Sequence, residues 1–118
     1  ARQHAAARAL MQSAEDGEII AVIPQSVIFE VAYVLQSQYG ATADRLATVV
    51  RALTTFPGGQ LADECPWKRV LDIWPDPIGG LADAVIAAVA RDTRCDAVAT
   101  FDKKLANKLP HFGLAAYF

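Results

Sequence analysis

The sequence is poor in the residues that most often mark zinc, disulfide or nucleophile chemistry. Its 118 residues include only two cysteines and two histidines. Cys65 and Cys95 have neither CxxC spacing nor a nearby histidine, so they indicate no zinc site and no redox pair, and we expect buried, reduced thiols. His4 and His111 lie near the two ends in polar or loop segments, which is typical of surface histidines. No Ser-His-Asp or Cys-His set is therefore expected.

Positive charge is also not in excess. The formal net charge is −2 at pH 7, so composition alone gives no reason to expect nucleic acid as a partner. No apolar run approaches the roughly 20 residues that a membrane span needs. We therefore expect a soluble, cytoplasmic protein without a membrane partner, and any case for a nucleic-acid substrate has to come from a local site.

Strand and helix patterns alternate along the chain. Ile19 to Ile23 is a wholly apolar, β-branched run, typical of a parallel strand buried on both faces. Ser26 is expected to cap the helix that follows, and Gly40 to end it. Further short strands are predicted at 60–62, 96–101 and 114–118, with helices between them. The pattern favours a single domain over residues 1–118, of the three-layer α/β/α class with a mostly parallel central sheet.

Three acidic residues follow the predicted strands or begin the predicted helices. Glu30 lies one turn into the helix after the first strand, Asp83 lies in the first turn of a helix that begins after Gly80, and Asp102 directly follows the strand at 96–101. Parallel strands bring their carboxyl ends to one edge of the sheet, so we expect the three carboxylates to converge there. Glu30 has apolar neighbours on both sides, which predicts poor solvation of its charge.

A cluster of carboxylates without histidine or cysteine is suited to Mg²⁺ or Mn²⁺. Such ions activate water and stabilise the charge that develops on a phosphodiester during cleavage. A purely structural interpretation also exists for Glu30 and Asp83 taken singly, because an acid in the first helical turn stabilises a helix by roughly 0.3–1 kcal/mol. That interpretation weakens for the set, since carboxylates brought together repel one another unless a cation neutralises them.

Three stretches in this order resemble the PIN-domain ribonucleases, most closely the VapC-type toxins of toxin–antitoxin modules. They are Ile23 to Leu35, Leu81 to Ala88 and Ala99 to Leu105. The resemblance covers essentially the whole chain and implies that Glu30, Asp83 and Asp102 match the second, third and fourth acids of the family. It also implies that Thr100 matches the small hydroxyl residue of the last motif.

The same resemblance implies the activity and the partners. It indicates a Mg²⁺- or Mn²⁺-dependent endoribonuclease that cleaves RNA phosphodiester bonds, forms a homodimer, and is inhibited by a cognate antitoxin whose peptide lies near the acidic edge. Lys103 and Lys104, beside Asp102, either steer the RNA backbone or are ordinary surface residues.

A first strand ending in an aspartate belongs to the family pattern, and nothing strand-like precedes the first helix of this chain. We therefore expect the natural protein to have roughly 10–20 further N-terminal residues that supply this strand and its acid.

Two other classes remain open. A receiver domain also gathers acids at the carboxyl edge of a parallel sheet, but it gives no role to Glu30 or Asp83. A non-catalytic interaction module would keep the PIN-like fold without its chemistry.

Overall fold

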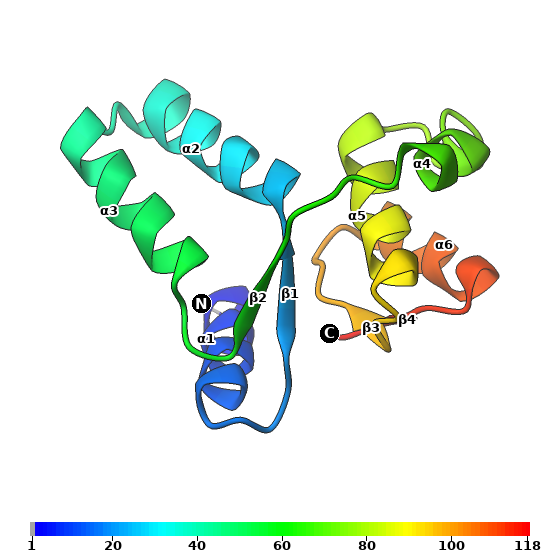
Figure 1. Cartoon of the computed structure of the whole chain (residues 1–118), viewed down its shortest axis with the longest axis horizontal. Helices are drawn as coiled ribbons and strands as arrows, with labels where there is room; N and C mark the ends of the chain where they lie inside the picture. Colours follow the sequence, from blue (N-terminus) through cyan, green and yellow to red (C-terminus); the bar gives the residue numbers. More distant parts are fainter. Residues whose placement is uncertain (1) are drawn as a thin grey trace. The chain divides into compact units, whose positions relative to one another are not determined.

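The computed structural model describes residues 2–118 (Figure 1). The chain forms two compact units, residues 2–63 and residues 64–118. The prediction of a single domain over 1–118 stays a prediction.

The first unit contains three helices and one pair of strands. Its elements are α1 (Arg2–Glu15), β1 (Ala21–Pro24), α2 (Gln25–Tyr39), α3 (Ala43–Thr54) and β2 (Gly59–Ala62). The strands β1 and β2 lie side by side and parallel, with Ala21 opposite Gly59 and Pro24 opposite Ala62 (Figure 1). The edge strand predicted near residues 60–62 is therefore confirmed.

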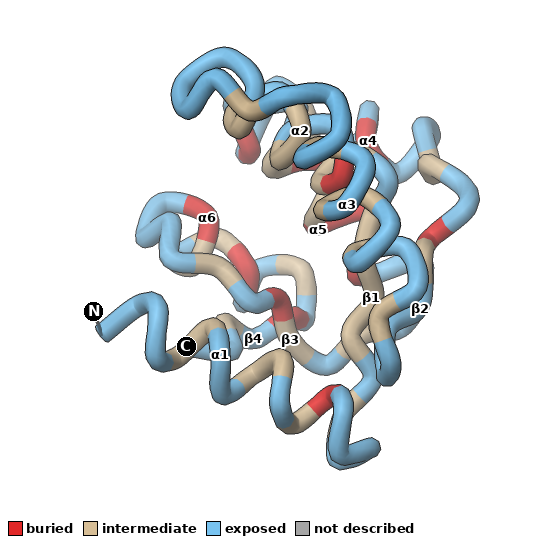
Figure 2. The backbone as a smooth tube through the Cα atoms, turned by 90° about the vertical axis from the view of Figure 1, so that its left-hand side faces the viewer, coloured by how far each residue is buried: buried red, intermediate tan, exposed pale blue. Residues whose placement is uncertain are grey.

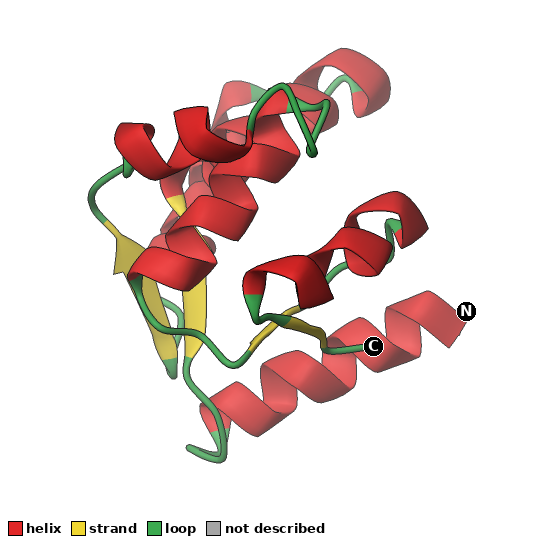
Figure 3. Cartoon of the chain, turned by 90° about the vertical axis from the view of Figure 1, so that its right-hand side faces the viewer, coloured by secondary structure: helices red, strands yellow, loops and turns green. Residues whose placement is uncertain are grey.

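The second unit contains shorter elements. They are α4 (Trp67–Ile73), α5 (Leu81–Asp92), β3 (Ala97–Val98), α6 (Lys103–Lys108), the 3-10 helix η1 (Leu109–Phe112) and β4 (Ala115–Ala116). Figure 3 shows how short its two strands are. They are parallel, with Ala97 opposite Ala115 and Val98 opposite Ala116, so the residues after both strands emerge at the same end.

The predicted α/β class with parallel strands is confirmed, with one difference in the extent of the sheet. Within residues 2–118 the strands form two separate two-stranded pairs. The strands predicted at 96–101 and 114–118 are each only two residues long. The first strand was also predicted to be buried on both faces, and this is wrong, since every residue of β1 is only partly buried.

The best-packed element of the second unit is α5, which is rich in buried alanine and valine (Figure 2). Ala84, Ala87 and Ala88 have no exposed surface at all. Their small side chains let neighbouring elements approach closely. Val70 of α4 and Leu109 of η1 are also fully buried in this unit. Arg69 of α4 and Asp92 of α5 form an ion pair at 3.3 Å across this packing.

Neither cysteine is fully buried, so the prediction of buried thiols is only partly correct. Cys65 and Cys95 are both half-buried and both free. Partial desolvation raises the pKa of the Cys65 thiol above its ordinary value, which disfavours the reactive thiolate at neutral pH.

The helix α2 ends as predicted but begins differently. Gly40 adopts the left-handed conformation at its C-terminus, with φ 62°, a conformation that glycine accepts without strain. The predicted capping role of Ser26 is wrong, because the helix already begins at Gln25 and Pro24 occupies the N-cap position. Instead the Ser26 hydroxyl is buried and has no hydrogen-bond partner among residues 2–118.

Replacing Ser26 by alanine is expected to raise the free energy of unfolding by about 1 kcal/mol, because a buried hydroxyl without a partner keeps its desolvation cost and alanine favours the helix. Urea unfolding of the two proteins measures this change. Ser37→Ala is the matched control on the same helix, since the exposed Ser37 hydroxyl donates to the Tyr33 carbonyl oxygen at 2.7 Å, and we expect a change within about 0.5 kcal/mol there. A lower urea midpoint for Ser26→Ala would show that the hydroxyl has a partner in solution.

In the described part of the chain, none of the helices has the length and apolar character needed to cross a membrane.

Candidate functional site

Glu30, the first predicted acid, is a solvent-exposed residue on α2. Its neighbours Phe29 and Tyr33 are also exposed, at 71% and 69% of their surface. The prediction that apolar neighbours would make this charge hard to solvate is therefore wrong, because Glu30 itself is exposed and Phe29 and Tyr33 lie in solvent beside it. Their exposure leaves the carboxylate accessible to a cation or a substrate.

Asp83, the second predicted acid, lies in the first turn of α5 and is half-buried. Gly80 precedes the helix, and a side chain there would come against the Asp83 carboxylate, with a Cβ placed 3.7 Å from Oδ2. This is an ordinary van der Waals distance, so a small side chain at position 80 would fit against Asp83 without displacing it. The N-terminal position on a 12-residue helix also stabilises the negative charge of Asp83.

Asp102 and Thr100 form a small hydrogen-bonded turn between β3 and α6. The Asp102 side chain caps α6, with Oδ1 accepting from the backbone N–H of Lys104 at 2.9 Å and of Leu105 at 3.3 Å. The Thr100 hydroxyl oxygen in turn accepts from the backbone N–H of Asp102 at 3.0 Å. The backbone N–H and the side-chain carboxylate of Asp102 are therefore both held by local hydrogen bonds.

The capping geometry uses only one oxygen of the Asp102 carboxylate. Within residues 2–118 the second oxygen, Oδ2, accepts no hydrogen bond, and the residue is exposed. An oriented carboxylate with an open oxygen is a suitable ligand for a hard cation or for a water molecule bound to one. The donor chemistry of Asp83 and Asp102 thus fits Mg²⁺ or Mn²⁺.

The predicted site residues are divided between the two units. Thr100 and Asp102 lie together in the second unit, which also contains Asp83, whereas Glu30 belongs to the first unit. No group of three or more acidic, histidine or cysteine side chains in residues 2–118 gathers as a set of metal ligands. The three-carboxylate ligand set stays a prediction.

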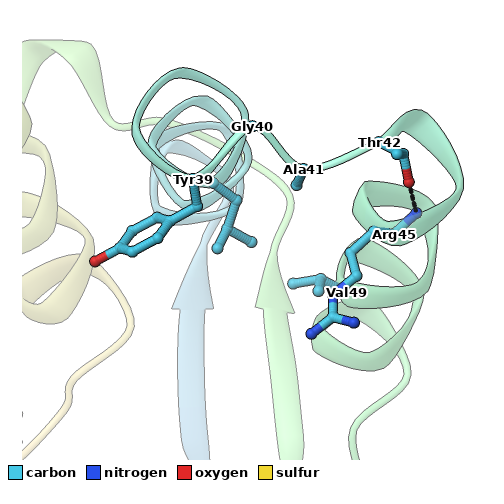
Figure 4. A pocket seen from close by; sticks show the side chains of 7 residues that line it. Tyr39, Gly40, Ala41, Thr42, Arg45 and Val49 are labelled. Carbon is cyan, nitrogen blue, oxygen red and sulfur yellow. Dashed lines mark hydrogen bonds between the residues drawn. The ribbon is translucent and has the colours of Figure 1, made fainter.

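An open pocket of about 480 Å³ lies at the end of the α2–α3 hairpin (Figure 4). Arg45 supplies its one charged side chain, and its backbone N–H donates to the Thr42 hydroxyl at 3.3 Å. Figure 4 shows the Tyr39 ring directed away from Arg45. Neither Glu30 nor any other predicted site residue lines this pocket, so the pocket is not part of the predicted carboxylate site.

An aromatic cluster beside Asp102 was not predicted from the sequence. Phe101 stacks on Phe118 with ring centroids 4.3 Å apart and an interplanar angle of 12°. Tyr117 meets Phe118 edge to face, at 5.4 Å and 89°. The signal that could have revealed the cluster is the predicted parallel pairing, because the ends of two parallel strands bring the residues after them together.

Comparison with protein families matches residues 1–108 to the PIN domain. This chain belongs to the PIN domain family. PIN domains are usually nucleases that hydrolyse phosphodiester bonds, typically with divalent metals such as Mg²⁺. The resemblance at the level of the PIN domain is therefore confirmed. Comparisons with curated proteins and with solved structures gave no match.

Proposed function

We propose that this PIN domain is a metal-dependent endoribonuclease of the VapC type, which cleaves RNA and is held inactive by a cognate antitoxin. The observation that carries the proposal is the Asp102 carboxylate, which is fixed through Oδ1 and left open at Oδ2 within a chain that matches the PIN domain. The resemblance of the three motif stretches to VapC-type toxins supports the finer assignment to RNA, a homodimer and an antitoxin.

Glu30, Asp83 and Asp102 are the proposed metal ligands, and Mg²⁺ or Mn²⁺ is the proposed cofactor. When bound, the ion activates a water molecule and stabilises negative charge on the phosphodiester. Asp102 contributes an oxygen whose direction is set by the α6 cap. Thr100 holds the backbone of Asp102 through its hydroxyl, so we assign it a positioning role in that turn.

Removal of divalent metal is expected to abolish RNA cleavage, because carboxylates alone repel the phosphodiester and cannot stabilise the negative charge that develops on it, which a bound ion does. The assay follows a single-stranded RNA with Mg²⁺, with Mn²⁺ and with a chelator.

Asp83→Asn is expected to slow cleavage about a hundredfold or more in Mg²⁺, since it removes one charged ligand while preserving side-chain size.

The matched control is Asp72→Asn, which removes an exposed acid of α4 in the same unit. It is expected to cleave RNA at the wild-type rate. Cleavage that survives chelation, or that is equally insensitive to both substitutions, would contradict the assigned site. Tight RNA binding without any cleavage in either metal would favour the non-catalytic module.

A further inference from the structure

The aromatic cluster of Phe101, Tyr117 and Phe118 is an exposed surface feature. The three side chains keep 41%, 44% and 42% of their surface accessible. Clustered aromatic rings normally lie in a core, because their burial stabilises a fold strongly. Here Phe118 contacts both Phe101 and Tyr117, and all three residues still present accessible surface to solvent, so the cluster is available to a ligand.

The backbone fixes the position of this cluster. The N–H of Ala115 donates to the Asp96 carbonyl at 3.3 Å and the N–H of Tyr117 donates to the Val98 carbonyl at 2.9 Å. These bonds extend the parallel pairing of β3 and β4. As a result the residues after β4 emerge beside the residues after β3, and the stacked rings lie next to the turn that holds Asp102. Fixed aromatic rings lose little conformational entropy when a planar ligand stacks on them.

The charge around the cluster differs from that of the whole chain. Residues 100–118 contain three lysines and one aspartate, whereas the complete sequence has a net charge of −2. Lys103 and Lys104 directly follow Asp102 and are both exposed. A phosphate backbone placed at Asp102 through a bound cation would therefore also meet positive side chains, with aromatic rings beside it.

We infer that Phe101, Tyr117 and Phe118 form a stacking platform for an unpaired nucleobase of a single-stranded RNA, and that Lys103 and Lys104 contact the adjacent phosphates. This inference rests on the proposed ribonuclease function and adds to it a surface that would hold a base beside the cleaved bond. Base stacking on aromatic side chains is tolerant of base identity and requires bases that are not paired. The platform thus selects unpaired segments next to the cleaved bond.

Fluorescence anisotropy with two labelled RNA oligonucleotides of about eight nucleotides tests this inference. One is an intact adenosine oligonucleotide, and the other has the same backbone with its central nucleotides abasic. Both are measured with a chelator present, so that binding is observed without cleavage. Phe118→Leu is expected to weaken binding of the intact RNA about tenfold and to leave binding of the abasic RNA unchanged, because leucine keeps the apolar bulk but cannot stack.

Two further variants control for folding. Phe118→Tyr keeps an aromatic ring and is expected to bind the intact RNA as the wild type does. Trp67→Leu removes another exposed aromatic side chain of the same unit, at 54% exposure, outside the cluster, and is expected to leave both affinities unchanged. Loss of binding to intact and abasic RNA alike in Phe118→Leu would overturn the inference, as would unchanged binding to both.

The outcomes separate the platform from the proposed catalytic function. Ring-dependent binding of intact RNA by a protein that never cleaves it in Mg²⁺ or Mn²⁺ would reject the nuclease and retain the platform. Metal-dependent cleavage combined with ring-independent binding would retain the nuclease and reject the platform. If Phe118→Leu abolishes self-association in sedimentation and leaves RNA binding intact, the cluster is a protein interface and the inference is wrong.

Discussion

Asp102→Asn is expected to slow metal-dependent RNA cleavage about a hundredfold or more while leaving the stability of the protein nearly unchanged. The reason lies in the two roles of this side chain. Its Oδ1 caps α6 through the N–H groups of Lys104 and Leu105. Asparagine caps helices as well as aspartate does, so the substitution removes the negative charge offered to a metal ion without removing the cap.

Asp102→Ala separates the two roles. Alanine removes both the charge and the cap, so we expect the same loss of cleavage together with a loss of about 1 kcal/mol in the free energy of unfolding. Cleavage rates at saturating Mg²⁺ and urea unfolding curves of the three proteins test the comparison. Wild-type cleavage by Asp102→Asn would exclude this carboxylate as a metal ligand, and a large loss of stability in that variant would show a structural role beyond the cap.

Gly58→Ala is expected to destabilise the first unit by about 3 kcal/mol. Gly58 precedes β2 and has a φ of +80°, a conformation that costs an L-residue roughly 1–2 kcal/mol. In addition, a Cβ at this position would overlap the backbone carbonyl of Ala14 near the end of α1. A backbone atom cannot rotate away as a flexible side chain does, so the helix or the strand pair would have to move.

Gly17→Ala is the matched control for Gly58→Ala. Gly17 has nearly the same φ, +78°, but a Cβ there would meet no atom within 4 Å, so only the conformational cost of roughly 1–2 kcal/mol applies. The difference between the two urea midpoints therefore reports the close approach of α1 to the turn before β2. Equal losses in the two variants would show that this approach does not occur in solution.

Local sequence signals predicted which helices and strands form in this chain more accurately than they predicted how long each one is. Gly40 was identified as the end of α2, since glycine readily adopts the left-handed conformation that closes the helix there. The limits of β3 and β4 were overestimated, because apolar composition continues beyond the two residues that pair in each strand. Ser26 was assigned to a cap on residue preference alone, whereas α2 already begins at Gln25 and the hydroxyl is buried.

The acids of the candidate site could be predicted because their type and order are visible in the sequence, and their joint role stays a prediction. The hydrogen bonds that orient Asp102 were not, since a cap depends on the backbone angles of the turn between β3 and α6. The exposure of Glu30 was mispredicted for a related reason. Apolar neighbours indicate burial only when another element covers them, and Phe29 and Tyr33 remain exposed.

The sequence by itself determined the PIN family and the α/β class, and it predicts the acidic residues of the candidate site, because each depends on residue types in a fixed order along the chain. Only the tertiary structure decided that Phe101 stacks on Phe118 beside Asp102 and that Gly58 lies against Ala14. These contacts join residues distant in sequence, and their geometry follows from strand pairing and helix packing rather than from any local preference.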